Sequence, residues 1–123
     1  MTTVLVIEDE SVLRREVVDL LTFEGYDVVE AADGREGLRE ALLHLPDLII
    51  SDILMPNLDG HGVLRGLRAN PTTRDIPFIF LTAKSNTYDD AGKSQDLGVC
   101  AFVSKPFTFN ELVEAIQACL KTS

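Results

Sequence analysis

Leu48-Ile49-Ile50-Ser51-Asp52 is the stretch that decides the fold, because three successive apolar residues run directly into a serine and an aspartate. Successive apolar residues are typical of a strand that is covered on both faces, whereas a half-exposed strand alternates. Similar short runs recur along the chain, far enough apart for a helix to lie between them. The runs that we expect to form strands are residues 4–7, 27–30, 48–51, 78–81 and 101–103.

Helical spacing of apolar residues marks the segments that separate and follow these runs. The expected helices lie between residues 11 and 25, 33 and 46, 59 and 71, about 87 and 97, and from 108 onward. Two of them open with capping-box patterns, Asp33 with Glu36 and Thr108 with Glu111. The segment at about 87–97 contains a central glycine and has the poorest helical pattern.

Five strands that alternate with five helices predict an α/β fold built from βαβ units. For a chain of 123 residues, we expect a doubly wound five-stranded parallel sheet of order 2-1-3-4-5 with helices on both faces, which is a flavodoxin-like fold. The chain has no linker-like or repetitive segment, so the prediction is one domain over residues 1–123.

The charge and hydropathy of the chain exclude several classes of protein. With 11 Lys and Arg against 20 Asp and Glu, the net charge is −9 and the basic residues are scattered, which argues against a direct nucleic-acid ligand. No apolar run approaches the roughly 18 residues of a membrane-spanning helix, and the N-terminus does not resemble a signal peptide. We therefore expect a soluble, cytoplasmic domain without membrane contact.

The cysteines and histidines indicate no zinc or redox motif. Cys100 and Cys119 form no CxxC pattern, and each lies among apolar neighbours, so both are predicted to be small core residues. His44 and His61 are too isolated in the sequence to predict a zinc site.

Polar side chains follow four of the five predicted strands. Glu8 and Asp9 follow the first, Asp52 the third, Thr82 the fourth and Lys105 the fifth. Since ligands bind at the carboxyl ends of parallel strands, we expect these side chains to meet in one crevice. Three adjacent carboxylates repel one another unless a cation lies between them, and oxygen ligands without His or Cys favour Mg²⁺, with Mn²⁺ as an alternative.

Phosphoryl transfer to a carboxylate is the chemistry that this set of residues suits. Asp52 would act as the nucleophile, while the metal and the Lys105 ammonium neutralise the phosphoryl oxygens. Thr82 adds a hydroxyl donor to the same crevice.

The sequence also resembles the receiver domain of two-component response regulators, the group that includes the chemotaxis regulators. The resemblance covers essentially the whole chain. It is carried by VLVIEDE at 4–10, PDLIISDILMPNLDG at 46–60, IPFIFLTA at 76–83 and GVCAFVSKPF at 98–107.

The resemblance implies a role for each signature position. Asp52 would be the phosphoacceptor, and the metal ligands would be Glu8, Asp9, Asp52 and the backbone carbonyl of Leu54. Thr82 and Lys105 would bind the phosphoryl group. Thr82 and Phe102 would form the conformational switch, and the bond between Lys105 and Pro106 would be cis.

The resemblance also implies a signalling switch rather than a turnover enzyme. Asp52 would receive its phosphoryl group from a sensor histidine kinase or a histidine phosphotransfer protein. The surface formed by the fourth helix, the fifth strand and the fifth helix would then change, and a downstream protein or an output domain outside this chain would recognise it. Dimerisation on phosphorylation through the same surface is left open.

Three other classes of protein are alternatives to this assignment. Haloacid-type phosphatases place a second Asp two residues after the nucleophile, where this chain has Leu54, which cannot transfer a proton. A flavodoxin-like cofactor binder needs a Ser, Thr or Gly-rich loop after the first strand, and Glu8 and Asp9 would repel a phosphate there. A degenerate receiver, acting as a phosphorylation-independent interaction module, remains the main alternative.

Overall fold

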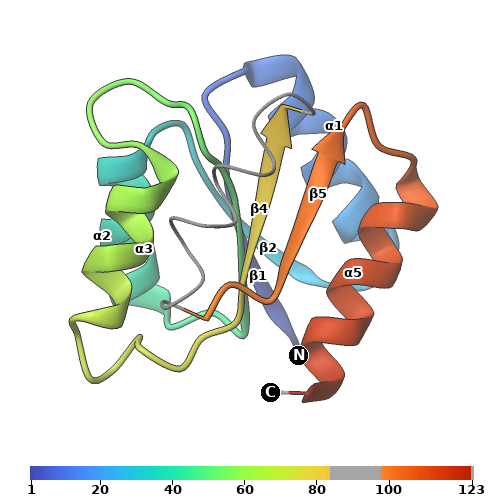
Figure 1. The fold of residues 1–123 in the computed structure, drawn as a ribbon. Coiled ribbons are helices and arrows are strands. Elements are labelled where there is room, and N and C mark those ends of the chain that lie inside the picture. The colour runs from blue at the N-terminus through green and yellow to red at the C-terminus, as the bar shows by residue number, and fades with distance from the viewer. Residues whose placement is uncertain (84–97, 123) are drawn as a thin grey trace.

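The computed structural model describes residues 1–83 and 98–122, which form a layered α/β domain (Figure 1). The helix expected at about 87–97 lies outside the described residues. In chain order, the described elements are β1 (Thr3–Ile7), α1 (Ser11–Phe23), β2 (Asp27–Ala31), α2 (Gly34–His44), β3 (Leu48–Asp52), α3 (Gly60–Arg68), β4 (Phe78–Ala83), β5 (Ala101–Lys105) and α5 (Phe109–Thr122).

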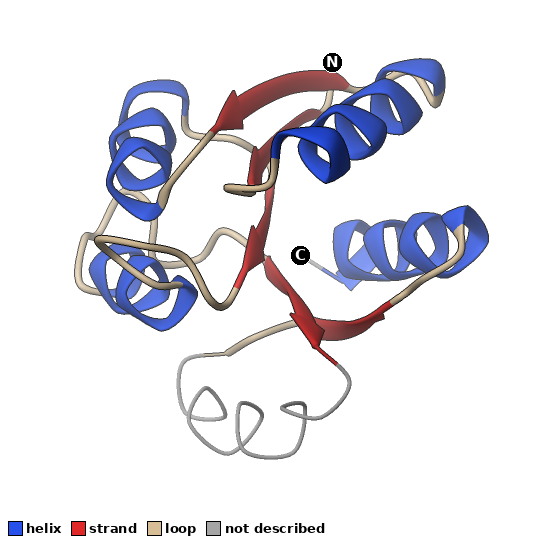
Figure 2. Ribbon diagram, turned by 90° about the horizontal axis from the view of Figure 1, so that it is seen from above, coloured by secondary structure: helices blue, strands red, loops and turns tan. Residues whose placement is uncertain are grey.

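The strands form one parallel sheet of order β2-β1-β3-β4-β5, which confirms the predicted topology. Helices α2 and α3 cover one face of the sheet, and α1 and α5 cover the other (Figures 1 and 2). Both faces are therefore shielded from water, which is why the central strands are apolar on successive residues.

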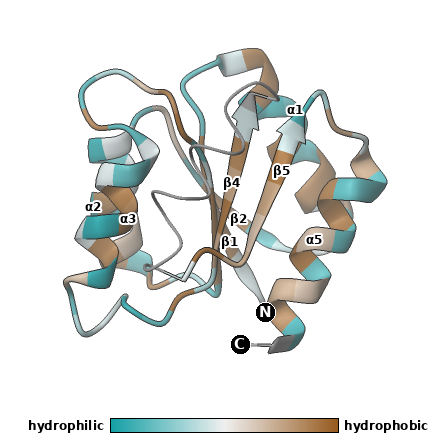
Figure 3. Cartoon of the chain, viewed as in Figure 1, coloured by the Kyte–Doolittle hydropathy of each residue, from teal (hydrophilic) through white to brown (hydrophobic). Residues whose placement is uncertain are grey.

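Two hydrophobic clusters fill the spaces between the sheet and its helices. On β1, Val4 and Val6 belong to the cluster beneath α1 and α5, whereas Leu5 and Ile7 belong to the cluster beneath α2 and α3. All four side chains are fully buried. In Figure 3, hydrophobic colour runs along most of β4 and β5, and the helices carry both hydrophobic and hydrophilic stretches.

The predicted helix caps are present at both capping-box sequences. The Asp33 carboxylate accepts a hydrogen bond from the Glu36 amide at 2.8 Å. At the start of α5, the Glu111 amide donates to the Thr108 hydroxyl and the Thr108 amide donates to the Glu111 carboxylate, both at 3.1 Å. These bonds satisfy amides that the first helical turn leaves free.

All five strands are longer than the sequence pattern predicts, and in β3, β4 and β5 the additional residues include Asp52, Thr82 and Lys105 of the candidate site. The ladder pairs Asp52 with Leu81, Thr82 with Ser104, and Ala83 with Lys105. Polar side chains end the apolar pattern, but the main-chain groups still have partners on the neighbouring strand. Asp52, Thr82 and Lys105 are therefore held by the sheet rather than by a loop.

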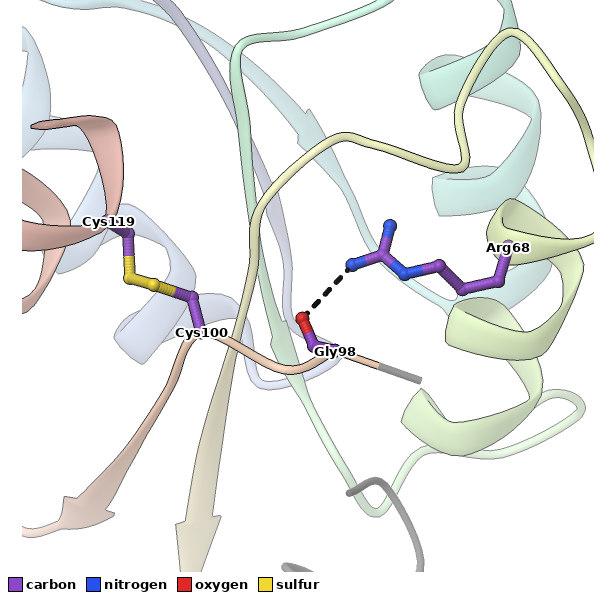
Figure 4. The surroundings of a disulfide bond; sticks show 4 residues. All are labelled: Arg68, Gly98, Cys100 and Cys119. Atoms are coloured by element: carbon purple, nitrogen blue, oxygen red, sulfur yellow. Dashed lines mark hydrogen bonds between the residues drawn. A yellow bond between two sulfur atoms is a disulfide. The ribbon is translucent and has the colours of Figure 1, made fainter. Parts of the chain in front are cut away.

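The prediction that the two cysteines are separate core residues is wrong, because Cys100 and Cys119 form a disulfide (Figure 4). Cys119 is buried at 1% exposure, as a core residue should be, but Cys100 is exposed. The two residues meet because α5 runs back along β5, so its last turns lie beside the first residue of the strand. Their Cα atoms are 5.9 Å apart.

Among the described helices, none combines the length and the apolar composition needed to cross a membrane.

Candidate metal and phosphoryl site

The carboxyl ends of β1, β3, β4 and β5 bring the predicted site residues to one edge of the sheet. Glu8 follows β1 directly, and Asp52 is the last residue of β3. Thr82 lies near the end of β4, and Lys105 ends β5. Glu8 and Thr82 are buried, at 0% and 1% exposure, whereas Asp9 is exposed, so the crevice has a buried polar floor and an open side.

Glu8, Asp9 and Asp52 form an acidic triad. Each offers a carboxylate oxygen, and these oxygens all lie within 4.8 Å of one another. Burial, together with the nearby charge of Asp52, raises the pKa of Glu8 from its usual 4.5 to about 7. A divalent cation would remove this repulsion, and three carboxylates without His or Cys are a donor set that suits Mg²⁺.

Lys105 bridges two members of the triad. Its Nζ donates to Asp52 Oδ2 at 3.0 Å and to Glu8 Oε1 at 3.2 Å. Burial by itself lowers the pKa of Lys105, but the hydrogen bond to Asp52 and the charge of Glu8 outweigh burial and raise it. Lys105 therefore remains a cation at neutral pH. The peptide bond that joins Lys105 to Pro106 is cis.

The other oxygen of Asp52 is held by the backbone. Oδ1 accepts a hydrogen bond from the Ile53 amide at 2.8 Å, so each carboxylate oxygen has a donor. The Ser51 hydroxyl donates to the Asp52 carbonyl, also at 2.8 Å. Asp52 is only 9% exposed, and these contacts fix its carboxylate at the mouth of the crevice.

Gly60 makes a close backbone approach behind Asp52. Its amide donates to the Ile53 carbonyl at 2.7 Å. A Cβ at this position would lie 2.5 Å from the Asp52 carbonyl oxygen and 2.9 Å from the Ile53 Cα. Only glycine fits here without moving the strand end that carries Asp52.

Arg14 supports the acidic end of β1 from α1. Its Nη1 donates to the Glu8 carbonyl at 2.8 Å, and its Nε donates to the Glu30 carboxylate at 3.0 Å. The Glu10 amide donates to Glu8 Oε2 at 3.1 Å. Together these bonds orient both the backbone and the side chain of Glu8.

A chain of aromatic rings connects α3 with β5. The ring centroids of Phe80 and Phe102 are 5.7 Å apart, and Phe80 lies 5.1 Å from His61 in an edge contact. His61 is 94% buried, which the sequence pattern did not predict. Its position in the first turn of α3, among glycines and valine, was the signal that it faces the sheet. Leu54, by contrast, lies in the loop after β3 with a side chain that is 64% exposed.

The sheet order and the acidic triad with its lysine define a flavodoxin-like domain with an acidic crevice that could hold a cation. A family model for the response regulator receiver domain matches residues 4–117. The chain belongs to this family. Response regulator receiver domains are the phosphorylation-dependent switch modules of two-component signalling and work with histidine kinases.

Relatives of known sequence agree with this assignment. The chain is 41% identical over 121 residues to the response regulator ArlR of Staphylococcus saprophyticus, and 40% identical to ArlR of Staphylococcus aureus. The match covers 98% of this chain but 53% of each relative, so the chain spans about half the length of these curated proteins.

Solved structures show the same fold. A receiver domain from Clostridium thermocellum is 30% identical with a TM-score of 0.91, and covers 99% of this chain and 96% of that one. The receiver domain of the sensor histidine kinase PA1611 from Pseudomonas aeruginosa, solved with a magnesium ion coordinated in its active site cleft, is 31% identical with a TM-score of 0.88. That match covers 98% of both chains.

Proposed function

We propose that Asp52 is the phosphoacceptor of this receiver domain and takes its phosphoryl group from a histidine kinase or a histidine phosphotransfer protein. The observation that carries the proposal is the position of Lys105 Nζ, 3.0 Å from Asp52 Oδ2 inside an acidic triad. A lysine at this position offsets the negative charge around the nucleophile. It can also donate hydrogen bonds to the oxygens of an incoming phosphoryl group.

Glu8, Asp9, Asp52 and the carbonyl of Leu54 are the groups that would hold Mg²⁺, with Mn²⁺ as an alternative. The ion would supply charge neutralisation for the phosphoryl oxygens. In the transfer itself, a carboxylate oxygen of Asp52 attacks phosphorus, and the bond between phosphorus and the donor nitrogen breaks. The donor imidazole keeps that electron pair, and Asp52 becomes an acyl phosphate.

Thr82 and Phe102 are the residues that would transmit the change. The added phosphoryl oxygens offer new acceptors to Lys105 and to the Thr82 hydroxyl. Thr82 lies on β4 opposite Ser104 of β5, so its movement reaches the strand that carries Phe102. A local charge change would in this way bias the packing of Phe102 against Phe80.

The chain would act as a switch rather than a turnover enzyme, since its own Asp52 is the group modified. We place its action in the cytoplasm, where a kinase would supply the phosphoryl group. The surface around β5 and α5, with the segment before β5, would be recognised by a downstream protein or an output domain outside this chain. The proposal includes no direct contact with nucleic acid or membrane, and dimerisation on phosphorylation is one form that the output could take.

Incubation of the chain with acetyl phosphate and Mg²⁺ tests the proposal directly. We expect intact mass to rise by about 80 Da, the mass of one phosphoryl group. EDTA should prevent the gain, and so should the substitution Asp52→Asn, which keeps the shape of the side chain but removes the nucleophile. An unchanged mass in the presence of Mg²⁺ would instead favour the degenerate module.

The affinity for Mg²⁺ should depend on pH through Glu8. A proton and the cation compete for this carboxylate, whose pKa is raised to about 7 by burial. The apparent affinity is therefore expected to rise about tenfold between pH 6 and pH 8. Without metal, the stability of the folded state should depend on pH in the opposite direction. A carboxyl with a raised pKa stabilises the fold below pH 4.5, and this contribution is lost as the pH rises through 7.

Calorimetric titration with Mg²⁺ at several pH values measures this dependence. The matched control is Glu8→Gln, which should bind Mg²⁺ more weakly but with little change over the same pH interval. A wild-type affinity that is flat from pH 6 to pH 8 would contradict the role assigned to Glu8.

A further inference from the structure

The two halves of the disulfide differ in their access to solvent. Cys100 is exposed and directly precedes β5. Cys119 lies in α5 at 1% exposure, within the hydrophobic cluster between that helix and the sheet. A thiolate that attacks a disulfide must reach one of the two sulfur atoms. Here only one half of the bond belongs to a residue that solvent can reach.

The disulfide is also one of several attachments of the short segment Gly98–Cys100. The Cys100 amide donates to the Phe78 carbonyl at 2.8 Å, which aligns the segment with β4. Arg68 of α3 donates from Nη2 to the Gly98 carbonyl at 3.4 Å. In Figure 4, Arg68 and Cys119 approach this segment from opposite sides. The disulfide is the attachment that joins it covalently to α5.

We propose that Cys100–Cys119 is a thiol–disulfide exchange site that a cysteine thiol, such as that of glutathione, enters at Sγ of Cys100. The incoming thiolate forms a bond to this sulfur, and the bond between the two protein sulfurs breaks. Cys119 Sγ leaves with the electron pair and takes up a proton from water. A second glutathione thiolate then attacks the mixed disulfide, which releases Cys100 as a thiol and yields glutathione disulfide.

Opening the bond removes the covalent link between the start of β5 and α5. The hydrogen bonds of Cys100 and Gly98 to β4 and α3 do not depend on it, so the segment stays in place but is held less firmly. We expect faster amide hydrogen exchange at residues 98–101 and in the last turn of α5. The other end of β5, where Lys105 pairs with Asp52, should change little because its contacts are independent of the disulfide.

The native chain provides the first measurement. Reduction by glutathione under native conditions should occur at a rate proportional to glutathione concentration, with a mass gain of about 2 Da for two added hydrogens. The melting temperature of the reduced form is expected to be lower by about 10 °C, because the unfolded chain loses a loop constraint. A reduction rate that is independent of glutathione concentration would overturn the proposal, since the bond would then open only through unfolding.

Two single variants provide the second measurement. When Cys119→Ser is treated with glutathione disulfide, the free Cys100 should form a mixed disulfide and gain about 305 Da, the mass of one glutathionyl group. The matched variant Cys100→Ser leaves the buried Cys119 and should react at least about 100-fold more slowly. Equal rates for the two variants would show that Cys100 is not the point of entry. Neither measurement involves Asp52, so its outcome is independent of the phosphoryl chemistry.

Discussion

Replacing Lys105 by methionine should slow phosphorylation by acetyl phosphate by about 10²- to 10³-fold, while the affinity for Mg²⁺ rises. The ammonium contacts both Asp52 and Glu8, at 3.0 and 3.2 Å, and methionine has nearly the same length without the charge. The phosphoryl oxygens would lose a positive partner, whereas a divalent cation would lose a competing charge. Opposite effects on the two quantities distinguish this role from general destabilisation.

The rate is measured by intact mass over time, and the affinity by titration with Mg²⁺ in the absence of a phosphodonor. We estimate a gain in affinity of roughly tenfold, because a charge a few ångströms away is only partly screened at such a site. Lys121→Met is the matched control, since this exposed lysine lies near the end of α5, two residues after Cys119, whose disulfide to Cys100 places it at the other end of β5 from Lys105. A Lys105→Met chain that phosphorylates at the wild-type rate would remove Lys105 from the proposed mechanism.

The substitution Gly60→Ala should lower the free energy of unfolding by about 3 kcal/mol or more, although alanine is the better helix former. The new methyl group would lie 2.5 Å from the Asp52 carbonyl oxygen and 2.9 Å from the Ile53 Cα. Both are main-chain atoms of a buried strand end, so they cannot move aside cheaply. Because the displaced backbone carries Asp52, the phosphorylation rate should also fall.

Gly66→Ala in the same helix separates this clash from helix propensity. Its Cβ would meet only the Leu38 side chain, with the nearest atom at 3.1 Å, and a leucine terminus can shift by a few tenths of an ångström. We expect unfolding in urea to show a free energy within about 1 kcal/mol of the wild type for Gly66→Ala. Equal stabilities for the two variants would contradict the close approach described at Gly60.

The helices and strands were predictable because their signals are local. The capping box formed by Thr108 and Glu111 spans a single turn, and the apolar residues 48–50 needed only their own order to indicate a buried strand. The predicted ends of β3, β4 and β5 lie one or two residues before the observed ends. Asp52 and Lys105 interrupt the apolar pattern, yet their main-chain groups remain in the ladder. Side-chain polarity does not report where main-chain pairing stops.

The disulfide was missed for a related reason. A spacing of 19 residues between Cys100 and Cys119 has no motif, and apolar neighbours suggested two core positions. In a βα unit, however, the helix runs back along its strand. A cysteine before the strand and one near the helix end therefore lie at the same edge, and this rule was available from the predicted topology alone.

The sequence by itself determined the order of the sheet, the family and the set of residues at the carboxyl edge, since each depends on short patterns read in chain order. The tertiary structure decided which of those residues touch. Lys105 reaches Glu8 and Asp52 across 97 and 53 residues of chain, and His61 packs on Phe80 from another element. Such contacts depend on the register and packing of whole elements, which no local stretch of sequence specifies.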